Sequence, residues 1–127
     1  MRSKLIGVIV VAVVAISFCV ACLIVVNHTV GQMEKLSMEA QDLVDKGQTS
    51  EGIAKMTQLA TEWKSHQSFL EMLISHTEMH TVVERYVEAE ASLKRGRVDE
   101  FYKAMALLQE NLDHIRQQQR VRWGNIL

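Results

Sequence analysis

Two histidines and a glutamate spaced four residues apart, His76, His80 and Glu84, are the side chains best suited to chemistry. Residues four apart lie on one face of a helix, and imidazole and carboxylate groups bind zinc and other transition metals. A helical zinc protease carries glutamate directly after the first histidine, whereas this sequence has Thr77. The trio therefore predicts a metal-binding or pH-sensing face. The alternative is an ordinary polar network at the edge of a helical bundle, in which His114 of a later helix could face His76.

Other combinations of reactive side chains do not assemble into a site. Cys19 and Cys22 have the spacing of a redox or metal pair, but they lie among valines, isoleucines and leucines and are interpreted as small apolar fillers. The spacing of the residues does not combine a nucleophile with a base and a third group that orients the base. The glycines are isolated and form no phosphate-binding loop. We expect no enzymatic activity and no cofactor.

The C-terminal residues Trp123, Ile126 and Leu127 form an apolar tail after the glutamines at 117–119. Such a tail either packs back on the preceding helices or binds a partner, and it is the predicted partner contact. The chain also has 7 methionines, whose adaptable side chains suit core filling and permissive partner surfaces alike.

An uncharged apolar segment, Leu5–Val26, dominates the N-terminal part of the sequence. As a helix it would be about 33 Å long, enough to cross a hydrocarbon layer of about 30 Å. A cleaved secretory signal has a shorter apolar region of roughly 7–15 residues, and the residues before Cys22 do not match a lipoprotein signal. We therefore expect a retained membrane anchor that contacts lipid.

The charges beside the anchor predict its orientation. Arg2 and Lys4 precede it, and no basic residue follows until Lys35, so the positive-inside rule leaves the N-terminus in the cytoplasm. The predicted organisation is a single-pass cell-membrane protein with three parts: a cytoplasmic N-terminus (1–4), a transmembrane anchor (5–26) and an extracytoplasmic helical domain (27–127).

Apolar residues at spacings of three and four predict helices throughout the domain. Gly47 and Gly96 each follow a basic residue and are typical of helix ends. Thr49 or Ser50 and Asp99 are the expected caps of the helices that follow, and a further break is expected at 65–68. The predicted core stripes are Val30, Met33, Leu36, Ala40, Leu43 and Val44; Ile53, Met56, Leu59, Ala60 and Trp63; Phe69, Leu70, Leu73, Ile74, Val83, Tyr86, Val87 and Leu93; and Tyr102, Met105, Leu108, Leu112 and Ile115.

The two glycine turns belong to a weak internal repeat, because residues 47–51 align with residues 96–100 at an offset of about 49 residues. The predicted fold is all-α: an N-terminal transmembrane helix followed by a small antiparallel bundle of about four helices, with tetratricopeptide-like hairpins as one possibility. The formal net charge is -1 and the basic residues do not cluster, so we expect no nucleic-acid partner.

The sequence resembles domain-of-unknown-function family 4363, a family of small single-span bacterial membrane proteins found in Firmicutes. The anchor carries the resemblance together with Trp63-x-x-His66, Leu73-Ile74-Ser75-His76-x-Glu78, Leu112-Asp113-His114-Ile115 and Asn125-Ile126-Leu127. It covers almost the whole chain. The resemblance implies an accessory role and no assigned activity. His80 stands where the family would have an acidic residue, which weakens an inherited histidine–carboxylate site.

These observations predict a non-enzymatic, membrane-anchored helical protein that acts as an accessory or protein-interaction module of the bacterial envelope, with a membrane or envelope protein as partner. One alternative is a sensor that binds a metal or small ligand through His76, His80 and Glu84. Another is a helical tether of the kind used in phage lysis or division, although such tethers usually have a long unbroken heptad pattern.

Overall fold

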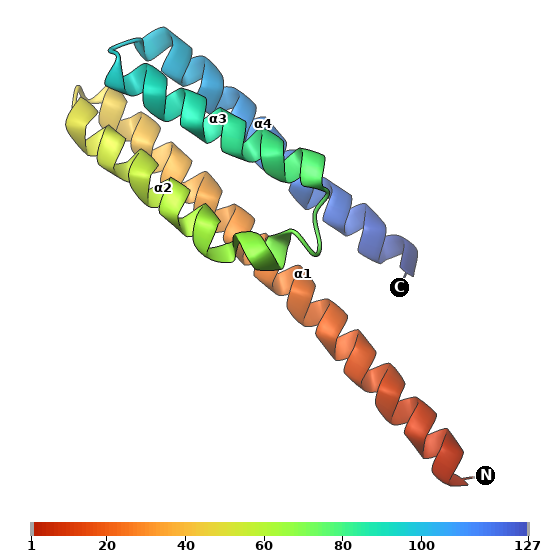
Figure 1. Ribbon diagram of the computed structural model, residues 1–127. Coiled ribbons are helices and arrows are strands. Elements are labelled where there is room, and N and C mark those ends of the chain that lie inside the picture. Colours follow the sequence, from red (N-terminus) through yellow and green to blue (C-terminus); the bar gives the residue numbers. More distant parts are fainter. Residues whose placement is uncertain (1, 127) are drawn as a thin grey trace.

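The computed structural model describes residues 2–126, and in this range the chain is helical with no strand. There are four helices, α1 (Arg2–Asp45), α2 (Thr49–Leu70), α3 (His76–Lys94) and α4 (Val98–Ile126). Figure 1 shows a bundle with one helix, α1, extending far beyond it. The predicted all-α fold is confirmed.

The helices form two antiparallel hairpins, α1–α2 and α3–α4, that close on each other. α4 packs against α1 and α3 packs against α2, so that every helix of the bundle has two neighbours. Tetratricopeptide hairpins stack in an open row, whereas this closure gives an up-down-up-down four-helix bundle.

α1 joins an exposed apolar segment to the bundle without a break. Its side chains are exposed almost continuously from Arg2 to Ala21, and they become buried at Cys22 (3% exposed) and Val26 (0%). In the described range, α1 is the one helix long and apolar enough to cross a membrane. The helical backbone passes directly through the predicted boundary between anchor and domain at Asn27.

The two hairpin turns have the same geometry. Gly47 has φ +79°, its amide donates to the Val44 carbonyl at 3.0 Å, and the next amide, of Gln48, donates to the Leu43 carbonyl at 2.8 Å. Gly96 has φ +74°, and the equivalent bonds there measure 3.1 and 2.9 Å. Both turns are Schellman motifs, in which glycine takes a left-handed conformation that costs other residues energy. The predicted helix ends are confirmed, and the turns repeat at the predicted offset.

The predicted caps after these turns are wrong. α2 already includes Thr49 and Ser50, and its N-cap residue is Gln48, which makes no side-chain capping hydrogen bond. α4 already includes Asp99, one residue after Val98. The Schellman turn leads into the next helix within two residues, so the expected capping side chains lie inside the first turn, where Asp99 still complements the helix dipole.

The predicted break at 65–68 is also wrong, since α2 continues to Leu70. The hydroxyl of Ser65 donates to the carbonyl of Glu62 at 2.7 Å and is accommodated in the helix. The break lies at 71–75 and ends at Ser75, whose side chain accepts a hydrogen bond from the amide of Glu78.

The core runs the length of the bundle, with Trp63, Tyr86 and Phe101 as its largest fully buried side chains. Most of the predicted stripe positions are buried or half-buried, but Val87 is exposed. The core also contains residues outside the predicted stripes: Met79, Val82, Ala89, Phe101 and Ala104.

Candidate functional site

The predicted metal-binding trio lies on one solvent-facing side of α3. The rings of His76 and His80 stack with their centroids 6.5 Å apart, and His80 Nε2 lies 3.0 Å from Glu84 Oε1. All three side chains are exposed. Among the described residues, no three His, Cys, Asp or Glu side chains are arranged to hold a metal ion. The trio shares a face as its spacing predicted, and metal binding there stays a prediction.

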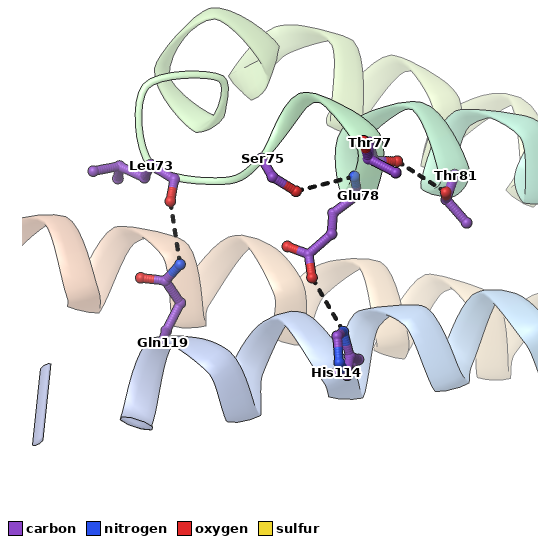
Figure 2. A network of polar contacts seen from close by, with 7 residues as sticks. All are labelled: Leu73, Ser75, Thr77, Glu78, Thr81, His114 and Gln119. Atoms are coloured by element: carbon purple, nitrogen blue, oxygen red, sulfur yellow. Dashed lines mark hydrogen bonds and ion pairs between the residues drawn. The ribbon is translucent and has the colours of Figure 1, made fainter. Parts of the chain in front are cut away.

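Another histidine–glutamate pair connects two helices. His114 Nδ1 of α4 lies 3.1 Å from Glu78 Oε1 of α3, as Figure 2 shows. The Glu78 amide also donates to Ser75 Oγ at 3.3 Å. His114 therefore faces Glu78, in place of the expected His76. The capping-box pattern of serine followed three residues later by glutamate could have identified the helix start at Ser75, but not the partner of the Glu78 carboxylate.

A cleft of about 410 Å³ opens beside this pair, between the 71–75 segment and the last turns of α4. Its lining is amphipathic and consists of Leu73, Ile74, Ser75, Glu78, His114, Gln117, Gln118, Gln119 and Val121. Across the Glu78–His114 pair lies a smaller hollow of about 190 Å³, where Asn111 contributes to the lining. The sequence does not reveal this cleft, because its walls come from two segments separated by at least 35 residues, 73–78 and 114–121.

Gln119 closes one side of the cleft. It is a buried polar residue, and its Nε2 donates to the carbonyl of Leu73 at 3.3 Å. This bond fixes the end of α4 to the segment that joins α2 and α3. A polar side chain in such a position stabilises the packing only while its hydrogen bond is made.

Polar contacts also join α1 to α4 along their length. Arg116 Nη2 lies 3.1 Å from Glu34 Oε2, and Gln109 Nε2 donates to Gln41 Oε1 at 3.0 Å. At the far end of the bundle, the Tyr102 hydroxyl is hydrogen-bonded to the carboxylate of Asp45, which raises the pKa of Tyr102.

The predicted apolar tail is, up to Ile126, the end of a helix. The backbone of 117–126 continues α4, so Trp123 and Ile126 belong to a helix in place of an irregular tail. The side chains of Trp123 and Ile126, and all of Leu127, lie outside the described residues. Partner binding by these three residues stays a prediction.

Comparison with known proteins agrees with the sequence resemblance. The family described as "Domain of unknown function (DUF4363)" matches residues 20–126, which is most of the chain and includes the whole bundle. No curated protein and no solved structure matches the chain. The match begins at the level where α1 starts to be buried, so family membership and the packed part of the structure coincide. The chain belongs to the DUF4363 family.

Proposed function

We propose that this protein is a non-enzymatic accessory module of the bacterial envelope, anchored by one membrane-crossing helix and presenting its bundle outside the cell to a membrane protein partner. The observation that carries the proposal is the continuity of α1. The same helix exposes apolar side chains at Leu5–Val20 and then supplies Val26, Val30 and Met33 to the bundle core. A bundle built on its own anchor cannot move far from the membrane.

The charge pattern supports the orientation. Arg2 and Lys4 lie at the start of α1, and the next basic residue is Lys35 in the bundle. Under the positive-inside rule, this pattern favours an orientation in which the other end of α1, with the bundle, is on the outer side.

Exposed apolar side chains on the bundle support a binding role. Met38, Met72, Val87 and Val121 are each more than half exposed. Methionine and valine scattered on a surface are common in monomeric proteins, but a partner that crosses the membrane beside α1 would reach Met72 and Val121 first. Exposed apolar side chains at the end of the bundle nearest the apolar segment of α1 favour a partner that is itself a membrane protein.

Photocrosslinking in native membranes tests this function. A photoreactive amino acid is placed at Met72 or Val121 in the full-length chain, and a matched control carries it at Ser50, at the opposite end of the bundle. One stoichiometric membrane protein captured from Met72 or Val121, but not from Ser50, supports an accessory subunit. Capture of no protein above background from any position contradicts the interaction module.

A further inference from the structure

The bundle begins at the level where a membrane crossed by α1 would end. A hydrocarbon layer of about 30 Å takes about 20 helical residues, and counted from Leu5 these end near Ile24. Cys22 and Val26, on either side of this level, are already buried by the rest of the chain. No spacer separates the bundle from the hydrocarbon boundary.

The contacts between α1 and α4 show which part of α4 lies at this level. Gln109 contacts Gln41, and Arg116 contacts Glu34, so seven residues forward along α4 correspond to seven residues back along α1. Continued at the same rate, this antiparallel pairing brings the C-terminal end of α4 level with the segment of α1 between Cys22 and Val26. In Figure 1 the C-terminal end of α4 accordingly points toward the apolar half of α1.

The segment between α2 and α3 lies at nearly the same level, because Gln119 is hydrogen-bonded to the carbonyl of Leu73. The surface at this end combines apolar side chains with a basic residue, and the exposed Glu71 beside it is hydrogen-bonded to Gln67. Met72 is 73% exposed and Val121 64% exposed, and Arg120 between Gln119 and Val121 is also exposed. We call Met72, Leu73 and residues 119–121 the membrane-proximal end.

We propose that the membrane-proximal end is seated in the lipid headgroup layer of the leaflet from which the bundle emerges. The headgroup regions add about 10–15 Å to the hydrocarbon thickness of a bilayer, divided between its two faces. By the register above and at ~1.5 Å per residue, Val121 lies level with Thr29, about 7.5 Å beyond Ile24 and so at the outer edge of that layer, and the long side chain of Met72 starts near the same level. There the apolar side chains leave water while the Arg120 guanidinium meets lipid phosphates, as interfacial residues do. The bundle then stands on the bilayer, with the Leu73 and Val121 edge of the 410 Å³ cleft nearest the headgroups. This inference rests on the proposed membrane crossing of α1.

Depth-dependent fluorescence quenching tests the seating. An environment-sensitive fluorescent amino acid is installed by codon suppression at Met72, which leaves Cys19 and Cys22 unchanged. Two control variants carry it at Val14, in the exposed apolar part of α1, and at Ser50, beside the far turn. Each full-length protein is reconstituted into phosphatidylcholine–phosphatidylglycerol vesicles with spin-labelled lipids. Circular dichroism verifies that each variant retains its helical content.

The seating predicts strong quenching of the probe at Val14 by labels in the acyl chain, strong quenching at Met72 by labels near the headgroup, and less than a tenth of that quenching at Ser50. Quenching at Val14 alone overturns the seating and leaves the anchor intact. Equal quenching at Met72 and Ser50 also overturns it, because the bundle would then lie on its side. Quenching at none of the three positions contradicts the membrane crossing itself, and with it the proposed function.

Discussion

Gly52 illustrates how single residues set the spacing of α1 and α2. It is buried in α2, and a Cβ atom added there would lie 2.8 Å from Cγ2 of Val44. Phe101 occupies the equivalent place in the second hairpin, 49 residues later in the sequence, and is fully buried. The two hairpins therefore share their turns but fill the adjacent core differently.

We expect Gly52→Ala to destabilise the bundle by about 1–3 kcal/mol, because the stiff side chain of Val44 would have to move. Gly31→Ala is the matched control, since its nearest neighbour would be Arg116 Nη2 at 3.9 Å, and mid-helix alanine gains about 1 kcal/mol over glycine. Thermal unfolding monitored by circular dichroism measures both changes. A Gly52→Ala protein as stable as Gly31→Ala would disprove the close approach.

The ion pair between Lys55 and Glu39 should make part of the stability depend on pH. Lys55 Nζ lies 2.9 Å from Glu39 Oε2, and this hydrogen bond lowers the pKa of Glu39. A carboxylate whose pKa is lowered by folding stabilises the folded state above its unfolded pKa and loses that effect as pH falls through the folded pKa. Lys55→Met should therefore cost stability at pH 7, with the difference from the unsubstituted protein disappearing near pH 3.

The control for this pair is Lys64→Met, which removes an exposed lysine from the same helix. Denaturant titrations at the two pH values compare the variants. The effect at pH 7 is expected to be small, since exposed ion pairs contribute little. A Lys55→Met penalty that is unchanged at pH 3 would show that lost packing of the lysine stem causes it.

At the scale of elements, the two Schellman turns provide a matched pair for mutation. Gly47 and Gly96 both have positive φ, and an added Cβ at either would meet no atom within 4 Å. We expect Gly47→Ala and Gly96→Ala to cost about 1–2 kcal/mol each, through backbone strain alone. Asparagine, which tolerates this conformation better, should recover part of the loss at each site. Chemical denaturation measures the series, and a neutral Gly96→Ala would contradict the common geometry.

The last turn of α4 tests the predicted partner contact. Deletion of 123–127 should reduce recovery of a crosslinked partner several-fold and leave the unfolding midpoint almost unchanged, because the described buried residues of α4 end at Gln119. The double variant Lys46→Ala and Arg95→Ala, at the opposite end of the bundle, serves as the control. Unchanged partner recovery after the deletion would show that this turn is not the contact.

Helix existence and most core positions follow from the sequence because a period of 3.6 residues is a local signal. The break predicted at 65–68 is wrong because serine hydroxyls, such as those at 65 and 68, can form their hydrogen bonds within a helix. The capping box that begins at Ser75 was the better signal. The Glu78–His114 pair and the cleft could not be predicted, since they depend on how α3 lies against α4. Periodicity predicts which face of a helix is buried, but it does not predict which other helix covers that face.

At the scale of the whole molecule, one uninterrupted helix links the exposed apolar segment to the core. The closed bundle also differs from an extended coiled-coil tether, because after the turns at Gly47 and Gly96 the helices α2 and α4 run back toward the apolar end of α1. If the apolar segment of α1 crosses a membrane, as proposed, a change in its position there would move the bundle with it. Such coupling suits the proposed role of a subunit held beside a membrane protein partner.

The most direct test of this account is the sidedness of α1 in intact cells. Ser50→Cys and Ser3→Cys place a thiol beyond either end of the apolar segment, and a membrane-impermeant maleimide labels those that face outward. The unsubstituted chain, with Cys19 and Cys22, gives the background. We predict that the Ser50→Cys protein is labelled in intact cells and the Ser3→Cys protein only after permeabilisation. The reverse pattern, or labelling of neither variant until the cells are opened, would contradict the account.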